Sequence, residues 1–247
     1  MTTPEIRVLP DPAALFHAAA NEFVAQAQSA FRERGRFTVA LAGGSTPKGL
    51  YSLLASNAAL PWDKVFFFFG DERHVPPDDP DSNYRMARES LLSKISVPPG
   101  NVFRVPAENP DANQAATSYE QTMRNFFRVP PGGFPVLDLV LLGMGPDGHT
   151  ASLFPGGKAS QEDSHWVVSD WVEKFKTDRI TLTLPVLKNA NEVMFLVSGK
   201  DKTATLREVL EGNQPGTQFP SKLVHPIHGK LIWMVDQAAA ANLSERV

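Results

Sequence analysis

The stretch FTVALAGGSTPKGLYSLL, residues 37–54, decides the fold. It begins with a continuous apolar run, Phe37 to Ala42, of the kind that forms a strand buried on both faces. A Gly-rich loop follows at 43–47, and helical spacing resumes through Leu50, Tyr51 and Leu54. Strand, Gly-rich loop and helix in this order form the repeating unit of a parallel α/β sheet.

The same order recurs along the rest of the chain. Continuous apolar runs predict strands at Val65 to Phe69, Val136 to Leu142, Val193 to Val197 and Leu231 to Val235, and the alternating ITLTL at Ile180 to Leu184 predicts a more exposed strand. Helical spacing predicts helices at Pro12 to Arg34, which Gly35 would end, and at Tyr84 to Leu92, Asp111 to Phe127 and Lys200 to Leu210. We therefore expect an α/β fold with a mostly parallel, doubly wound sheet.

Composition limits the classes of function. The chain has 247 residues, 42% of them hydrophobic, and no linker-like segment, so we expect one domain over residues 1–247. The 24 Lys and Arg and 27 Asp and Glu are mixed along the chain, which gives no indication of nucleic-acid binding. The chain has no Cys, which excludes disulfides and thiolate chemistry and fits the cytoplasm. The N-terminal residues lack a signal-peptide core and no apolar run is long enough to span a bilayer, so we expect an unprocessed chain without membrane attachment.

Polar loops follow several predicted strands, at the edge where open α/β sheets bind ligands. The first loop contains Gly43, Gly44, Ser45 and Thr46 and leads into a helix, whose free N–H groups favour an anion, although an ordinary capped turn has the same composition. It lacks the Walker spacing, so a nucleoside triphosphate is not indicated. The segment GDERH at 70–74 follows the apolar run VFFFF and forms either a charged site or a solvated turn with local ion pairs.

The segment GMGPDGH, residues 143–149, contains the pattern G-x-G-x-x-G after a strand. We reject a dinucleotide site, because Pro146 and Asp147 interrupt the loop and polar residues follow it. The glycines instead suit a backbone that brings Asp147 and His149 close to a ligand, although a His in a surface turn is the ordinary alternative. Lys202 and Arg179 also stand at strand ends, as ligand contacts or as surface charges.

Several of these segments occur together in one known family. LAGGSTPKGLY, FFGDERHVPPDDPDSNYRMARE, LDLVLLGMGPDGHTASLFPG, RITLTLPVL and SGKDK follow each other as in the 6-phosphogluconolactonases, which the chain resembles from about Phe37 to Asp236. That family is in turn similar to the glucosamine-6-phosphate deaminases. The resemblance implies a Rossmann-like sandwich and hydrolysis of 6-phospho-D-glucono-1,5-lactone to 6-phosphogluconate, the second step of the oxidative pentose phosphate pathway, without a cofactor or a metal.

Site residues follow from the same resemblance, position by position. The catalytic His149 would have Asp147 beside it and Arg73 nearby, and Asp71 would contact the substrate. The GGST loop, Arg179 and Lys202 would hold the phosphate.

Two departures from related patterns are visible. The deaminases carry a Glu for ring opening in the stretch that matches GPDGHTASLFPG, which has no acid at that place. Many lactonases carry a Lys-Pro-Pro-like stretch before the Arg of RITLT. Lys174 is in register with that Lys and would contact the substrate, but the prolines are missing here, which leaves the loop less preorganised.

The chemistry of a lactone also favours this interpretation. Attack of water on the carbonyl needs a base such as His149, oriented by Asp147, and a cation such as Arg73 for the oxyanion. A serine hydrolase is disfavoured because no G-x-S-x-G elbow exists. A metallohydrolase lacks the HExxH spacing, and a non-catalytic sugar-phosphate sensor of the same fold is a further alternative. The expected ligand is a small molecule; the oligomeric state stays open, and a monomer is consistent with the sequence.

Overall fold

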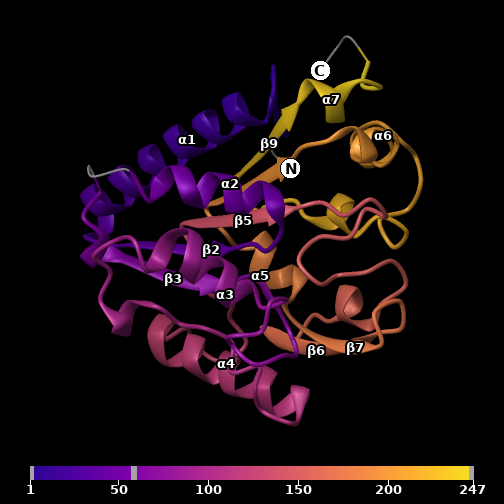
Figure 1. Ribbon diagram of the computed structural model, residues 1–247. Coiled ribbons are helices and arrows are strands. Elements are labelled where there is room, and N and C mark those ends of the chain that lie inside the picture. Colours follow the sequence, from indigo (N-terminus) through magenta and orange to yellow (C-terminus); the bar gives the residue numbers. More distant parts are fainter. Residues whose placement is uncertain (1–2, 57–59, 245–247) are drawn as a thin grey trace.

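In the computed structural model, which describes residues 3–56 and 60–244, a parallel sheet forms the centre of the protein (Figure 1). Its six strands run in the order β1-β9-β8-β5-β2-β3. They are β1 (Glu5–Leu9), β2 (Phe37–Leu41), β3 (Val65–Phe69), β5 (Leu139–Gly143), β8 (Glu192–Val197) and β9 (Lys230–Asp236). A second sheet of three antiparallel strands, in the order β4-β7-β6, consists of β4 (Asp71–Arg73), β6 (Val167–Val172) and β7 (Thr177–Leu182). The predicted α/β class with a mostly parallel sheet is confirmed.

Helices cover both faces of the parallel sheet. They are α1 (Pro12–Arg34), α2 (Ser45–Leu54), α3 (Asn83–Ala87), α4 (Ala112–Phe127), α5 (Leu184–Lys188), α6 (Thr203–Leu210) and α7 (Gln237–Ala240). Within the described ranges, no helix combines the length and the apolar character that crossing a membrane requires.

The aromatic residues of β3 show why the sheet is covered twice. Successive side chains of a strand point to opposite faces. On one face, Trp62 stacks on Phe67 at 6.2 Å and also meets Phe23 of α1 at 6.4 Å. On the other, Phe126 of α4 lies 5.1 Å from Phe66 and 5.2 Å from Phe68. The continuous apolar run VFFFF therefore has helices on both sides, as its composition predicts.

Several boundaries differ from the sequence-based predictions. The helix α1 and its glycine stop are confirmed, because Gly35 has a φ of 70° and its N–H bonds back to Phe31. The strand predicted at Val136 to Leu142 is β5, which spans Leu139–Gly143 and so begins three residues later. The helix expected from Tyr84 is α3 followed by a π-helical turn at Arg88–Leu92, and the helix expected from Lys200 begins with a 3-10 turn.

Two expectations about the second sheet were wrong. The segment after β3 is the strand β4, and it pairs with β7 instead of forming a turn. The strand predicted at Ile180 to Leu184 is shifted to Thr177–Leu182, and it is buried at its C-terminal half rather than exposed, because Ile180 and Leu182 are 0% exposed. The strands β1 and β6 were not predicted. Their side chains are mixed in polarity, since each lies at an edge of its sheet.

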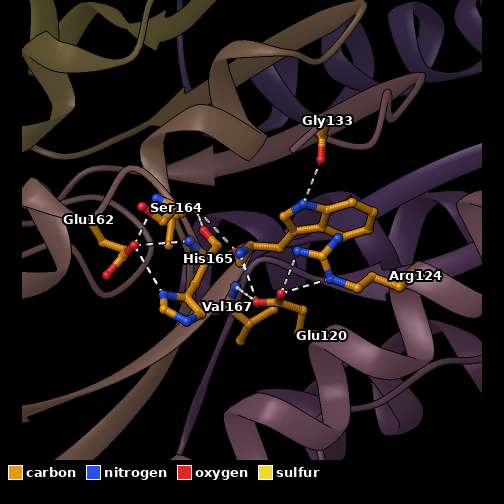
Figure 2. A network of polar contacts seen from close by, with 9 residues as sticks. Glu120, Arg124, Gly133, Glu162, Ser164, His165 and Val167 are labelled. Atoms are coloured by element: carbon orange, nitrogen blue, oxygen red, sulfur yellow. Dashed lines mark hydrogen bonds and ion pairs between the residues drawn. The ribbon is translucent and has the colours of Figure 1, made fainter. Parts of the chain in front are cut away.

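A buried carboxylate joins α4 to the second sheet (Figure 2). Glu120 accepts hydrogen bonds from the backbone N–H groups of Trp166 at 2.8 Å and Val167 at 3.1 Å, where β6 begins, and from Arg124 Nε at 2.8 Å. The Arg124 guanidinium also lies 4.3 Å from the Trp166 ring, whose Nε1 donates to the Gly133 carbonyl at 2.9 Å. These bonds fix the start of β6, so the hairpin that β6 forms with β7 has a defined position.

Another buried carboxylate lies at the start of β8. Glu192 is 1% exposed, and its Oε2 accepts a hydrogen bond from Gln26 Nε2 at 2.6 Å. Its Oε1 is buried without a hydrogen-bond partner among the described residues. Burial, and then the charge of nearby Glu22, raise the pKa of Glu192 to about 8. The carboxyl group is therefore held in its neutral form in the folded chain near neutral pH.

This raised pKa predicts a pH-dependent stability. Because the folded pKa of about 8 lies above the ordinary 4.5, the contribution of Glu192 is complete below about pH 4.5 and is lost as pH rises toward 8. Glu192→Gln keeps an acceptor for Gln26 and cannot ionise. We expect the free energy of unfolding of Glu192→Gln, relative to that of wild type, to increase as pH rises from 5 to 9, by at most about 1.4 kcal/mol per pH unit. Urea unfolding at three pH values measures this. The control is exposed Glu89→Gln, whose difference from wild type should stay constant over this range, because the pKa of Glu89 is lowered by Arg85. A pH-independent difference would contradict the interpretation.

Candidate active site

A cavity of ≈ 280 Å³ lies where β2 and β5 end. From β2 the chain crosses to β3 on one side, and from β5 it continues to β8 on the other, so the two crossovers diverge at this point. Such a divergence leaves a crevice outside the carboxyl ends of the strands. Most of the predicted site residues line the cavity: Gly43, Gly44, Ser45, Thr46, Asp71, Arg73, His149, Arg179 and Lys202.

The loop after β2 presents the N-terminus of α2 to this cavity. Gly44 is the N-cap, with a φ of 99° and no side-chain hydrogen bond to the first turn. The first backbone N–H to bond back is that of Lys48, to the Gly44 carbonyl at 3.2 Å. The N–H groups of the first turn, together with the positive end of the helix dipole, therefore suit an anion. A Cβ at Gly43 would lie 2.1 Å from Asn83 Oδ1, so the glycine allows the Asn83 side chain to approach this loop.

Two arginines face each other across the second sheet. Arg73 of β4 is directly opposite Arg179 of β7, an arrangement of like charges that is unfavourable on its own. Arg73 Nη1 donates to the Asp81 carbonyl at 2.5 Å, but Arg179 Nη1 is buried without a hydrogen-bond partner among the described residues. Burial, and then the charge of Arg73, lower the pKa of Arg179. An anion bound to Arg179 would give Nη1 a hydrogen-bond partner and would offset the repulsion from Arg73.

A polar network holds the wall beside the arginines. Asp71 Oδ2 accepts a hydrogen bond from Ser152 Oγ at 2.7 Å, and Asp71 Oδ1 accepts one from Asn83 Nδ2 at 3.2 Å. Glu72 points to the other face and accepts from the backbone N–H groups of Asn83 at 2.7 Å and Tyr84 at 2.8 Å. Burial raises the pKa of Glu72 despite these bonds. The two acids fix the start of α3 against β4.

His149 and Asp147 form a hydrogen-bonded pair. His149 Nδ1 lies 2.5 Å from Asp147 Oδ1. Partial burial raises the pKa of Asp147, but the hydrogen bond and charge of His149 outweigh it and hold the pKa well below its ordinary value. An ionised carboxylate only accepts, so Nδ1 carries the proton and Nε2 is the basic nitrogen of the neutral ring. Asp147 is held in turn by Lys174, whose Nζ is 3.4 Å from Oδ2.

The structure thus separates the predicted residues into two groups. Asp147 and Lys174 do not line the cavity but support His149 from behind, whereas the other predicted residues line it directly. The sequence did not single out several further lining residues, namely Asn83, Ser152, Phe154, Phe175 and Ser198. Phe175 could have been predicted as a site residue from the sequence, since it is a large apolar residue within the charged segment EKFKTD. Buried Asp236 was also missed; it accepts hydrogen bonds from Ser198 Oγ and the Gly199 N–H and so holds the loop that leads to Lys202.

Comparisons with known proteins identify the family of the chain. Residues 10–233 match the family of glucosamine-6-phosphate isomerases and 6-phosphogluconolactonases. The chain belongs to this family. A 6-phosphogluconolactonase of Nostoc sp. is 42% identical over 239 residues, which cover 97% of this chain and 98% of the relative. The structures of the 6-phosphogluconolactonases of Trypanosoma brucei and Trypanosoma cruzi are similar, with TM-scores of 0.89 and 0.87 at 30% and 33% identity. They cover 99% and 98% of this chain, and 100% and 97% of theirs.

The pairing of His149 with Asp147 depends on a glycine, and this generates a prediction. A Cβ at Gly145 would lie 2.0 Å from His149 Nδ1 and 2.8 Å from Asp147 Oδ1. Because flexible side chains rather than backbone meet the added methyl group, we expect Gly145→Ala to fold and to lose the pairing. The measurement is the low-field Nδ1–H resonance of His149 in the proton NMR spectrum. Gly100→Ala, where nothing lies within 4 Å of the added Cβ, serves as the control and should keep the resonance. If Gly145→Ala also keeps it, the geometry described for the pair is wrong.

Proposed function

We propose that this protein hydrolyses 6-phospho-D-glucono-1,5-lactone to 6-phospho-D-gluconate, the second step of the oxidative pentose phosphate pathway. The observation that carries the proposal is the buried Nη1 of Arg179, which faces Arg73 and has no partner among the described residues. An unsatisfied cation of this kind suits the phosphate of a substrate. It lines the same cavity as His149, so an anion site and a base are available to one small molecule.

In this proposal, the phosphate binds between Arg179, Lys202 and the first turn of α2 at Gly44, Ser45 and Thr46. These groups come from separate elements that line one cavity. A guanidinium can contact two phosphate oxygens at once, whereas Lys acts as a point charge. Phosphate binding supplies energy at a distance from the reacting carbon and fixes the orientation of the sugar. Asp71, held by Ser152 and Asn83, would accept hydrogen bonds from the sugar hydroxyls.

The reaction then needs two proton transfers. His149 Nε2 removes a proton from water, whose oxygen attacks the lactone carbonyl, and Arg73 stabilises the negative charge that develops on the carbonyl oxygen. The tetrahedral intermediate collapses with cleavage of the bond between the carbonyl carbon and the ring oxygen, which takes the proton from the His149 imidazolium. The product acid ionises and releases one proton. Asp147 stabilises the imidazolium between the two steps.

The site argues against the alternatives in specific ways. A deaminase would use a Glu for ring opening, and at the matching place this chain has Phe154, whose ring lies against His149. The described residues contain no group of three or more His, Asp and Glu side chains suited to a metal ion. A sugar-phosphate sensor does not need the base that the His149 and Asp147 pair provides. We further propose that the protein acts in the cytoplasm as one domain on this small molecule.

Replacement of the base tests the mechanism. His149→Ala should lower kcat by about 10² to 10⁴-fold, because proton transfer falls back on water. Its affinity for 6-phosphogluconate should stay within a few fold, since the imidazole is not assigned to binding. The assay follows acid release from freshly made lactone, with exposed His165→Ala as the matched control.

The same assay decides between the alternatives. EDTA should leave the wild-type rate unchanged, whereas a loss that zinc restores would support the metallohydrolase. Binding of 6-phosphogluconate with no acceleration over the spontaneous rate would support the sensor and refute the lactonase.

The phosphate site predicts a change in substrate preference. Arg179→Ala should cost about 2 to 4 kcal/mol in kcat/KM for the phosphorylated lactone, and Arg179→Lys should restore it only partly. Unphosphorylated gluconolactone should lose much less, so the preference of the wild type collapses. Arg207→Ala, an exposed Arg outside the cavity, should leave both values unchanged. Equal losses for both substrates would remove Arg179 from the phosphate site.

A further inference from the structure

Two aromatic side chains connect the two functional ends of the cavity. The Phe154 ring stacks on the His149 imidazole, with centroids 4.4 Å apart and planes inclined by 28°. The Phe175 ring makes a T-shaped contact with the Phe154 ring, with centroids 5.9 Å apart. The Arg179 guanidinium lies over the other side of this pair, 5.0 Å from the Phe175 centroid. We call these four residues, His149, Phe154, Phe175 and Arg179, the aromatic column.

At the Arg179 end of the aromatic column, Phe175 orients the guanidinium group of Arg179. A buried Arg is usually oriented by a carboxylate, which would compete with a phosphate for its donors. Here Nη1 has no hydrogen-bond partner among the described residues, yet the side chain needs a fixed direction. The face of Phe175 supplies a cation–π contact that orients the guanidinium plane and uses none of its N–H groups. The donors therefore stay available for a ligand.

Phe175 lies at the tip of the hairpin, between the end of β6 and the start of β7. Its side chain lies outside the core and is 44% exposed, which is a high value for a Phe. The neighbouring Lys174 bonds to Asp147, and Lys176 takes a positive φ of 51°, so the tip of the hairpin is held against the His149 and Asp147 pair. In this chain, Phe175 and Lys176 follow Lys174 at this tip.

At the other end, Phe154 completes the restraint on the base. The hydrogen bond to Asp147 holds one edge of the His149 ring, at Nδ1. Stacking on Phe154 packs against the face of the ring and so restricts the remaining side-chain motion of Nε2. A base in one direction is effective only when the substrate carbonyl is placed to match it.

We propose that Phe175 and Phe154 are positioning residues, Phe175 for the phosphate-binding guanidinium of Arg179 and Phe154 for the imidazole of His149. The proposal rests on the proposed function for the roles of Arg179 and His149. It assigns different measurable consequences to the two rings. Loss of the Phe175 ring weakens binding of the phosphorylated ligand, whereas loss of the Phe154 ring lowers turnover and leaves that binding unchanged.

Calorimetric titration with 6-phosphogluconate and with gluconate tests the Phe175 half without any turnover. Phe175→Leu should bind 6-phosphogluconate roughly 3- to 30-fold more weakly, the range of a cation–π contact, and should bind gluconate as wild type does. Phe175→Tyr, which keeps the ring, should restore the affinity. Trp171→Ala, on the same hairpin, exposed and outside the cavity lining, is the control and should change neither affinity. Unchanged affinities in Phe175→Leu, or equal losses for both ligands, would overturn the assignment.

Steady-state kinetics test the Phe154 half. Phe154→Leu should lower kcat roughly 3- to 10-fold, the range of one aromatic stacking contact, with an unchanged affinity for 6-phosphogluconate. Phe154→Tyr should restore kcat. An unchanged kcat, or a loss of kcat that Tyr does not restore, would overturn the positioning role. If wild type shows no lactone hydrolysis, the proposed function fails, and the calorimetric comparison still decides whether Phe175 orients Arg179.

Discussion

The parallel pairing of β2 with β5 is the constraint on which the rest of the site depends. Each strand is buried on both faces, so its backbone must be fully paired within the sheet and its polar groups can appear only where the strand ends. At that end, the chain leaves β2 toward one edge of the sheet and β5 toward the other. The loops at 42–47 and 143–149 thus face each other across a gap that no crossover fills.

The second sheet supplies what the parallel sheet cannot. Antiparallel pairing of β4 with β7 puts Arg73 opposite Arg179, and the same pairing puts Asp71 opposite Thr181 on the cavity side. This arrangement is unfavourable on its own, since it places like charges together and leaves a buried donor without a partner among the described residues. Glu120 anchors the start of β6 and so fixes the position of the β6–β7 hairpin, which carries Arg179 (Figure 2). Local features of this kind, which lower the stability of the fold, are typical of functional sites.

The sequence predicted those features that depend on local pattern. Apolar runs such as VFFFF, the glycine stop at Gly35 and the loop after β2 are local signals, and the structure bears them out. The second sheet was largely missed, because β4 is only three residues long, β6 is mixed in polarity, and the pairing of β4 with β7 joins segments far apart in the chain. Family resemblance supplied Arg73, Arg179 and Lys202, which periodicity alone does not distinguish from surface charge. Phe154 and Asn83 were missed, since their roles arise from contacts that no spacing rule encodes.

The bond between Ser152 and Asp71 has a consequence for the order of folding. It joins residues 81 positions apart, at 2.7 Å, and the cavity also needs the loop at Gly43 and the strand end at Ser198. Contacts of such long range form late, because the entropy of closing the intervening loops must be overcome first. Partly folded chains therefore lack the cavity. A ligand that binds there would stabilise only the completed fold, so it would shift the balance between native and unfolded chains without guiding the early steps of folding.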